Sequence, residues 1–295
     1  MEFSELFLIS CLLLIFYSVC LWSSGREREH FEDGQMVEPY DSFYAQIYKD
    51  LWHSHDLNFE RASIQDIALA EQHTDSVKIL DMACGVSQHA CWFKQLGVEF
   101  TGADNSKAML QQAEKDCPTA KFKLVDILEA SIFPPKTFTT CLLLGFSIYE
   151  FQNPKVLFDN ASAWLKPDGM LVVHMVDPDK YDPILNLASP FAAFSLQKYS
   201  FERQTKSEIY FSSFKYTGEL KKKPNHDDAQ FVERFTFFNA EDNDGTKYRE
   251  QQHEWNMPSV ERLIEIAKTS GLKLKEKVSL TPASKEYQYL IYFTK

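Results

Sequence analysis

Three aspartates stand at the ends of three successive strand-like runs in the first half of the chain. Asp81 ends KILD, Asp104 ends VEFTGAD and Asp126 ends KFKLVD, so the spacings are 23 residues (81 to 104) and 22 residues (104 to 126). A carboxylate accepts hydrogen bonds from both hydroxyls of a ribose, or from an amino group. The carboxyl ends of parallel strands open onto one edge of a sheet. We therefore expect the three acids to face one nucleoside-type ligand at that edge.

The loop after the first of these strands, DMACGVS, contains one glycine, Gly85. Backbone can approach a ligand closely there because no Cβ intervenes. Ser87 stands just before QHACWFKQL, where we expect a helix whose free N–H groups a serine hydroxyl can cap. A nicotinamide dehydrogenase is the main alternative, but its Gly-x-Gly-x-x-Gly fingerprint would fall on Ala83, Gly85 and Gln88. Its anionic pyrophosphate would also meet the carboxylate of Asp81, which disfavours that alternative.

From residue 77 onward, strand-like and helix-like segments alternate. Helices are expected through SQHACWFKQLG, SKAMLQQAEKDC and PKVLFDNASAWLKPDG, between the strands KILDMA, VEFTGAD, KFKLVDI, TFTTCLLLGFS and MLVVHMVD. Near-continuous apolar strands that alternate with helices are typical of a parallel sheet covered on both faces. An amphipathic helix, YDSFYAQIYKDLWHSHD, is expected before this series because its apolar residues recur at three- and four-residue steps.

Residues 178–256 depart from this alternation. EIYFSSFKY, QFVERFTFF and KYREQQHEW predict three antiparallel strands, whose polar–aromatic alternation suits one wetter face. A helix that begins after Ser259 and ends at Gly271 then restores the α/β pattern, with the strands LKLKEKVSL and YQYLIYFTK after it. We predict a Rossmann-like, doubly wound, mostly parallel seven-stranded α/β sheet with an antiparallel β insertion as a lid.

These motifs make the chain similar to the class I S-adenosylmethionine-dependent methyltransferases. That family carries an acid–x–Gly–x–Gly–x–Gly loop after its first strand, and DMACGVS matches it at Asp81 and Gly85. Ala83 and Ser87 replace the first and third glycines, and the alanine is acceptable if its backbone does not need positive φ. The similarity covers about residues 40–177 and, more loosely, the last helix and two strands. It implies a methyl-transferring enzyme whose cofactor is a sulfonium cation without phosphates.

The resemblance also implies a role for individual positions. Asp81 is expected to face the methionine amino group, Asp104 the ribose and Asp126 the adenine. Further cofactor-binding residues implied by position are Tyr40, Tyr44, Ala83, Gly85, Asn105, Ile127, Gly145 and Phe146.

Catalytic or orienting candidates are Tyr149 and Glu150 after the fourth strand, and His253 where the insertion rejoins the domain. A general base is needed only if the acceptor carries a proton that must leave. We interpret His174 as a buried core histidine. The sequences HSHD at 53–56 and HDD at 226–228 are interpreted as solvated loops, so no metal is predicted.

The expected acceptor is a small molecule. Methyltransferases that act on amino groups of nucleic-acid bases or of glutamine typically end the fourth strand with Asn/Asp-Pro-Pro-Tyr/Phe, whereas this chain has Gly-Phe-Ser-Ile. The net charge of −11, from 31 Lys and Arg against 42 Asp and Glu, also makes nucleic acid an unlikely partner. The loss of two glycines motivates an alternative: a non-catalytic binding or scaffolding module that kept the fold.

Residues 6–22, LFLISCLLLIFYSVCLW, form an uncharged run of the length that spans a bilayer. Glu2 and Glu5 precede it and no Ala-x-Ala pattern follows, which disfavours a cleaved signal. Arg26 and Arg28 follow it, which places the rest of the chain in the cytoplasm by the positive-inside rule. We expect a transmembrane helix at 1–25, a linker at 26–38 and a methyltransferase domain at 39–295. The cysteines show no paired spacing, which agrees with a reduced compartment.

Overall fold

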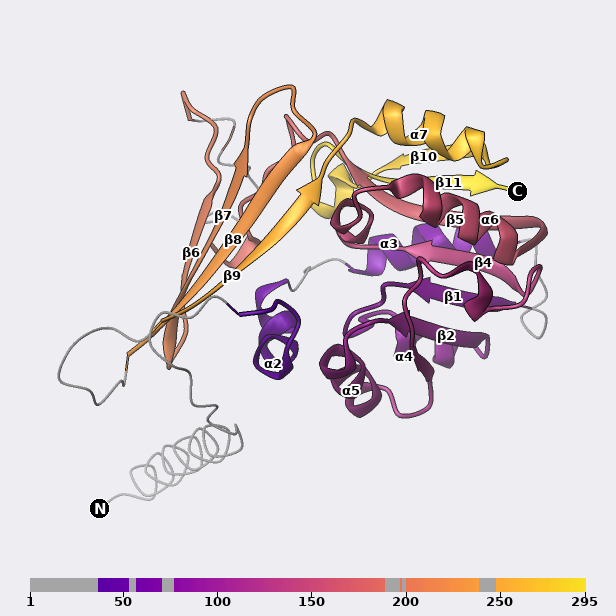
Figure 1. The fold of residues 1–295 in the computed structure, drawn as a ribbon, viewed down its shortest axis with the longest axis horizontal. Coiled ribbons are helices and arrows are strands. Elements are labelled where there is room, and N and C mark those ends of the chain that lie inside the picture. The colour runs from indigo at the N-terminus through magenta and orange to yellow at the C-terminus, as the bar shows by residue number, and fades with distance from the viewer. Residues whose placement is uncertain (1–36, 53–56, 71–76, 189–196, 198–199, 239–247) are drawn as a thin grey trace, which may run out of the picture. The chain divides into compact units, whose positions relative to one another are not determined.

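The computed structural model describes residues 37–52, 57–70, 77–188, 197, 200–238 and 248–295 (Figure 1). The predicted membrane anchor and nearly all of the predicted linker lie outside these ranges, as does the HSHD sequence. Across the described ranges, no helix is both long enough and apolar enough to span a bilayer.

A seven-stranded sheet forms the centre of the domain, in the order β10-β11-β5-β4-β1-β2-β3 (Figure 1). The first five strands in the chain pair in parallel, and β11 runs antiparallel between β5 and β10. The predicted mostly parallel sheet is therefore confirmed. The strands are β1 (Lys78–Met82), β2 (Glu99–Asp104), β3 (Lys121–Leu124), β4 (Phe138–Leu143), β5 (Leu165–Val176), β10 (Lys273–Ser279) and β11 (Gln288–Thr294).

Both faces of the sheet are apolar at its central strands, such as β1, and successive residues of a strand belong to opposite faces. Leu80 packs in one core cluster with residues of α6 (Pro154–Trp164) and α7 (Val260–Thr269). Its neighbour Ile79 packs in a second cluster with residues of α3 (Leu57–Ile64) and α4 (Ala90–Gln95). This period of two explains why the strands read as continuous apolar runs.

The helix ends follow from local capping. Ser106 precedes α5 (Lys107–Asp116) and accepts the backbone N–H of Met109, and Ser259 does the same for α7 at Arg262. Asn153 caps α6, which begins with Pro154. Shorter helical turns are η1 (Gln65–Leu69), η3 (Ala130–Ile132), η4 (Ser147–Glu150), η5 (Asn186–Ala188) and η7 (Thr281–Ala283).

The insertion forms a second, antiparallel sheet in the order β6-β7-β8-β9. Its strands are β6 (Lys206–Tyr210), β7 (Phe214–Lys222), β8 (Asp228–Phe237) and β9 (Tyr248–Asn256). The prediction of one strand through EIYFSSFKY was wrong, because the Phe211 N–H donates to the Phe214 carbonyl and turns the chain at the two serines. The expected wetter face is present, because buried and more exposed residues alternate along β7, β8 and β9, but Glu233, Gln251 and His253 lie on the buried face.

Helix α2 (Ser42–Leu51) packs between the antiparallel sheet and the parallel-sheet part of the domain (Figure 1). Phe43 packs against Phe214 and Phe235 of the antiparallel sheet. At the other side of the helix, Lys49 pairs with Asp116 of α5 at 2.6 Å. The predicted amphipathic helix therefore lies between the insertion and the parallel sheet.

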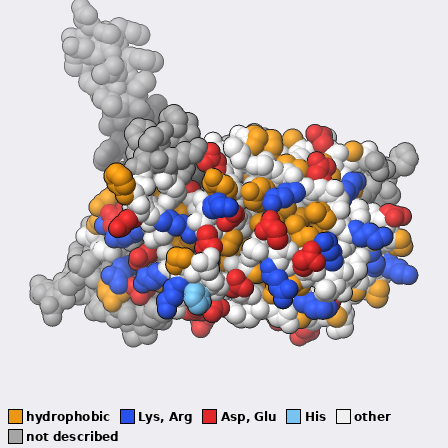
Figure 2. All heavy atoms as spheres, turned by 90° about the horizontal axis from the view of Figure 1, so that it is seen from above, with side chains coloured by type: hydrophobic (Ala, Val, Ile, Leu, Met, Phe, Trp, Pro, Cys, Tyr) orange, Lys and Arg blue, Asp and Glu red, His pale blue; other side chains and the backbone are white. Residues whose placement is uncertain are grey.

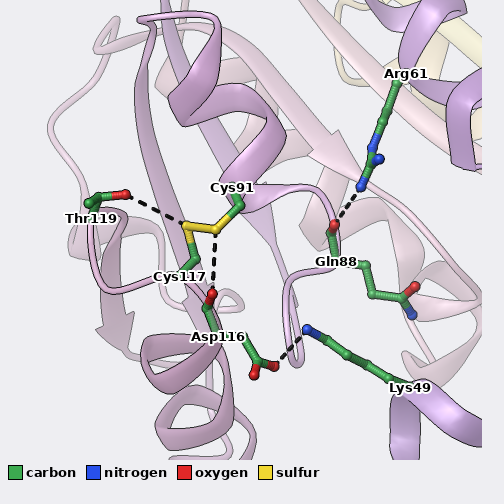
Figure 3. The surroundings of a disulfide bond; sticks show 7 residues. All are labelled: Lys49, Arg61, Gln88, Cys91, Asp116, Cys117 and Thr119. Atoms are coloured by element: carbon green, nitrogen blue, oxygen red, sulfur yellow. Dashed lines mark hydrogen bonds and ion pairs between the residues drawn. A yellow bond between two sulfur atoms is a disulfide. The ribbon is translucent and has the colours of Figure 1, made fainter.

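Cys91 in α4 and Cys117 at the end of α5 form a disulfide, with 5.4 Å between their Cα atoms (Figure 3). The expectation that the cysteines are unpaired was therefore wrong at these two positions. Sequence spacing identifies short motifs such as Cys-x-x-Cys, whereas these cysteines are 26 residues apart and meet only because α4 and α5 lie side by side. Cys84 and Cys141 are free thiols.

On the face that Figure 2 shows, Lys and Arg side chains alternate with Asp and Glu side chains. This face carries no continuous basic stripe of the kind that tracks a phosphate backbone.

Candidate cofactor and acceptor site

A cavity of about 640 Å³ lies beyond the carboxyl ends of β1, β2 and β4. Strand β1 pairs with β2 on one side and with β4 on the other, so the strand order reverses there. Ligands of open α/β sheets bind at such a reversal. The structure brings most of the predicted site residues to this cavity: Tyr40, Tyr44, Asp81, Ala83, Gly85, Asp104, Asn105, Gly145, Phe146, Glu150 and His253.

Asp126 and Ile127 line a small recess of about 20 Å³. Ala83, Asp104 and Asn105 line both this recess and the main cavity, so the two adjoin. The three strand-end acids therefore occur in the expected order along one edge of the sheet.

Asp104 is held by the loop that it faces. Its Oδ2 accepts the backbone N–H of Gly85 at 2.7 Å, and its Oδ1 accepts the N–H of Ser106 at 2.8 Å. Burial raises the pKa of Asp104, and these backbone N–H groups counteract the rise. Each carboxylate oxygen has a second lone pair. The side chain can therefore still accept hydrogen bonds from a ribose.

Asp81 is buried beside the same loop. Burial raises its pKa to about 7, although the hydroxyl of Ser87 donates to its Oδ2 at 3.1 Å and lowers the pKa. The expected capping role of Ser87 was therefore wrong, because α4 begins only at Ala90 and the serine hydroxyl is engaged by Asp81. A buried, nearly unpaired carboxylate is a suitable partner for an ammonium group.

The backbone is left-handed at all three positions where the family has glycine. The φ angles are +49° at Ala83, +54° at Gly85 and +48° at Ser87. The condition under which Ala83 would be harmless, a φ that is not positive, is therefore not met. A residue with a Cβ in this conformation costs about 1–2 kcal/mol. The loop has the conformation that glycines would favour and keeps it despite two unfavourable residues.

Hydrogen bonds of Tyr40 and Tyr44 hold α2 at the cavity. The Tyr40 hydroxyl donates to Oε1 of Glu150 at 2.7 Å, and the Ser106 hydroxyl donates to the Tyr40 carbonyl at 2.7 Å. The Tyr44 hydroxyl donates to Glu233 at 3.0 Å. The predicted amphipathic helix is thus held at the cavity by specific contacts of these two tyrosines.

His253 lies between two carboxylates. Its Nε2 is 2.9 Å from Oε2 of Glu233, and its Nδ1 is 3.6 Å from Oε1 of Glu150, which is an ion pair rather than a hydrogen bond. Burial alone lowers the pKa of His253, but the two carboxylates outweigh it and raise the pKa to about 9. The imidazole is therefore protonated near neutral pH, which disfavours the general-base role predicted for it.

The neighbours Tyr149 and Glu150 face different surroundings. Tyr149 is fully buried, and its hydroxyl exchanges hydrogen bonds with the backbone of Val176 at 2.7 and 3.3 Å. The structure therefore does not bring Tyr149 to the cavity, and its candidate catalytic role is replaced by a core role. Glu150 lines the cavity, with 25% of its side chain exposed.

His174 is buried and also lines the cavity, with its Nε2 3.1 Å from Oε1 of Gln288. Burial lowers its pKa to about 4, so it is neutral. Across the described part of the chain, no group of three or more His, Cys, Asp and Glu side chains is arranged to hold a metal ion.

Sequence reasoning missed a buried group around Glu233. This carboxylate has no exposed surface and accepts from Tyr44, Tyr216, Gln251 and His253. The polar alternation of β9 was the available signal, but it was interpreted as a solvated face. Also missed were cavity-lining residues from distant segments: Trp52, Glu60, His89, Tyr181, Phe231, Trp255, Lys285 and Gln288.

Comparisons with known proteins agree with this geometry. Residues 80–173 match a family described as "Methyltransferase domain". Over 101 residues, 34% of this chain, the sequence is 30% identical to a trans-aconitate 2-methyltransferase from Delftia acidovorans. The matched segment spans 38% of the length of that relative.

Solved structures share the fold over most of the chain. The CcbJ methyltransferase from Streptomyces caelestis has a TM-score of 0.64 at 14% identity, over 87% of this chain and 97% of its own. The sugar N-methyltransferase KedS8 from Streptoalloteichus has a TM-score of 0.62 at 14% identity, over 92% and 97%. The family match over residues 80–173 and the shared fold thus support the resemblance to class I S-adenosylmethionine-dependent methyltransferases that was stated from the sequence.

Proposed function

We propose that the protein binds S-adenosylmethionine in the cavity at the β1–β4 reversal and transfers its methyl group to a small-molecule acceptor. The observation that carries the proposal is the hydrogen bond from the Gly85 N–H to the carboxylate of Asp104, next to the buried Asp81. This arrangement offers hydrogen-bond acceptors for a ribose and for an ammonium group within one cavity.

The residues present fit this cofactor. Asp104 has free lone pairs for the ribose hydroxyls, and Asp81 is a buried carboxyl group that can pair with the amino group. A side chain placed at Gly145 would meet no atom within 4 Å, so the backbone there is open to a ligand. The volume of about 640 Å³ lies within the range of about 300–1,000 Å³ that is usual for ligand sites. When bound, the cofactor supplies an activated methyl group on sulfur. The protein aligns the reactants and excludes water.

A small acceptor is supported by the volume of the cavity, about 640 Å³, which is lined by residues of the parallel sheet, α2 and β9. It is also supported by the named activities of similar proteins. These include the trans-aconitate 2-methyltransferase, the sugar N-methyltransferase KedS8, and CalS10, an amino pentose methyltransferase from Micromonospora echinaspora.

Calorimetric titration of the full-length protein in detergent with S-adenosylhomocysteine tests the proposal. We expect saturable binding, and NADH titrated in parallel should not bind. If S-adenosylhomocysteine does not bind, the proposal is overturned. The alternative of a non-catalytic module is favoured by the strained Ala83 and Ser87. It predicts binding without any methylated product when the protein is incubated with labelled cofactor and a metabolite extract.

We propose further that residues 1–25 anchor the domain in a membrane, with the domain on the cytoplasmic side. The uncharged run at 6–22 and the following Arg26 and Arg28 support this topology. The disulfide Cys91–Cys117 is an opposing observation, because disulfides are rare in the cytosol. Protease protection of the domain in sealed vesicles decides the side, and mass spectrometry of the mature N-terminus shows whether the anchor is retained.

A further inference from the structure

We propose that the methyl acceptor is an amine, which binds in the same cavity next to the carboxylate of Glu150 and the aromatic rings beside it. The inference rests on the proposed function and specifies the substrate class of that site. It is carried by the hydrogen bonds of Glu150, by the charges around it and by the rings that line the cavity.

The carboxylate of Glu150 is fixed through one oxygen only. Its Oε1 accepts from the Tyr40 hydroxyl and from Trp255 Nε1, both at 2.7 Å, and is the oxygen nearest to His253. No described residue donates a hydrogen bond to Oε2. The side chain lines the cavity and is one quarter exposed. Glu150 therefore presents one oriented, unpaired acceptor to a ligand.

The charges around Glu150 leave one negative charge uncompensated. Burial raises its pKa, but His253, Tyr40 and Trp255 outweigh burial and lower the pKa, so the group is ionised. The protonated His253 is shared with Glu233, whose Oε2 it contacts more closely than it contacts Glu150. Two carboxylates thus share one imidazolium. A cationic group in the cavity would balance the remaining charge.

Aromatic rings form the neighbouring surface. Phe146, Trp255 and Phe231 stack in that order, with centroids 5.5 and 5.1 Å apart and interplanar angles of 8° and 5°. Trp52 lies across the stack, 5.9 Å from Phe146 and 5.6 Å from Phe231. All four rings line the cavity. Ring faces attract organic ammonium groups, most strongly where water is excluded.

The chemistry of an amine acceptor fits these surroundings. The ammonium form first loses one proton to solvent. The nitrogen lone pair then forms the new C–N bond while the methyl–sulfur bond breaks and leaves its electron pair on sulfur. Positive charge thereby moves to the nitrogen, and an adjacent carboxylate stabilises it more strongly in the transition state than in the neutral amine. Glu150 acts by charge and orientation, so no base of raised pKa is required.

A carboxylate acceptor fits less well. The ionised Glu150 would repel it, and Lys285, the lysine among the residues that line the cavity, is already paired with Glu60. A hydroxyl acceptor would need a base, and Glu150 has a lowered pKa while His253 is protonated. The observations therefore favour nitrogen over oxygen as the methylated atom.

Two measurements on the full-length protein test the inference. The first is binding of choline and of its neutral carbon isostere, 3,3-dimethyl-1-butanol, to protein saturated with S-adenosylhomocysteine. We expect choline to bind at least tenfold more tightly. The second is labelled methyl transfer to three acceptors of matched size: cyclohexylamine, cyclohexanol and cyclohexanecarboxylate. We expect transfer to the amine.

Glu150→Gln should remove the preference for choline and lower kcat/KM for the amine about 10- to 100-fold, as loss of a charge-assisted hydrogen bond implies. S-adenosylhomocysteine binding should stay intact, which also reports on folding. The matched control is Glu265→Gln, because this glutamate pairs with Lys268 on the surface of α7. If Glu150→Gln does not fold, Phe231→Leu should weaken choline more than the isostere.

The outcomes separate this inference from the proposed function. Intact S-adenosylhomocysteine binding with transfer to the alcohol or the carboxylate overturns the amine inference alone. Equal binding of choline and its isostere, without transfer to the amine, also overturns it. Failure to bind S-adenosylhomocysteine overturns the proposed function, and the inference with it.

Discussion

The backbone N–H of Gly85 donates a 2.7 Å hydrogen bond to Oδ2 of Asp104, which joins the loop after β1 to the end of β2. The other carboxylate oxygen of Asp104 accepts the Ser106 N–H, which is also at the start of α5. One side chain thus positions the loop, begins a helix and presents lone pairs to the cavity. The arrangement of the loop and of α5 around the cofactor site therefore depends on this carboxylate.

Asp104→Asn should weaken S-adenosylhomocysteine binding by about 1–3 kcal/mol, the usual cost of an unmatched hydrogen-bonding group. An amide has one oxygen, so its NH₂ group would face either the Gly85 or the Ser106 N–H, donor against donor. Calorimetric titration measures the change. Asp159→Asn is the control, because Asp159 is paired with Lys155 on the surface of α6. Unchanged affinity in the Asp104 variant would exclude it from the cofactor site.

Ala83→Gly should raise the free energy of unfolding by about 1 kcal/mol, because glycine adopts the positive φ of this position without a Cβ penalty. The matched control is Ala163→Gly on the exposed face of α6, where the helix makes glycine unfavourable by about 1 kcal/mol. Denaturant titration of both variants should therefore give opposite signs. A loss of stability in Ala83→Gly would show that the methyl contacts outweigh the backbone strain.

The strand-end acids could be predicted from the sequence because their placement follows from topology alone. Parallel strands end at the same edge of the sheet, so Asp81, Asp104 and Asp126 had to converge once their strands were identified. The backbone angle of Ala83 could not be predicted in this way. A family pattern states where glycine is usual. Only the structure of the loop shows that Ala83 keeps the left-handed conformation although it is not a glycine.

Binding of S-adenosylhomocysteine should strengthen about tenfold from pH 6 to pH 8, because the folded, unliganded protein has an Asp81 pKa of about 7 and the ligand ammonium needs the ionised form. Burial raises this pKa above that of the unfolded chain. Ionisation of Asp81 therefore lowers the stability of the unliganded protein as the pH rises from about 4 to 7. Titrations at several pH values should give a flat profile for Asp81→Asn. A steep profile in that variant would assign the dependence to another group.

The protonated His253 should stabilise the fold at neutral pH and lose that effect in alkali. Its folded pKa of about 9 lies above the unfolded value near 6.5, so the contribution is complete below about pH 6.5 and disappears as the pH rises through 9. Wild type should lose on the order of 3 kcal/mol more than His253→Gln between pH 6.5 and 10. Urea titrations across this range measure the difference, and equal losses in the two proteins would contradict the buried ion pair.

Two adjacent residues show the limit of sequence reasoning at the acceptor side. Tyr149 and Glu150 were equal candidates, yet one bonds the backbone of Val176 and the other faces the cavity. Both lie in the short turn η4, which has too few residues to show a periodic pattern. In β9, polar residues alternate as they would on a solvated face, but they are buried because Glu233 and His253 satisfy one another. Partners from other strands determine such burial.

The hydrogen bonds of Glu150 join segments that lie far apart in the sequence. Its partners Tyr40 and Trp255 lie 110 and 105 residues away in sequence, whereas Gly85 and Asp104 are separated by 19. Contacts between distant residues form late, because closing long loops costs more entropy. Joining Glu150 to Tyr40 and Trp255 therefore closes longer loops than joining Gly85 to Asp104 does. During refolding, recovery of S-adenosylhomocysteine binding should precede recovery of methyl transfer, so that activity appears only when the whole domain has folded.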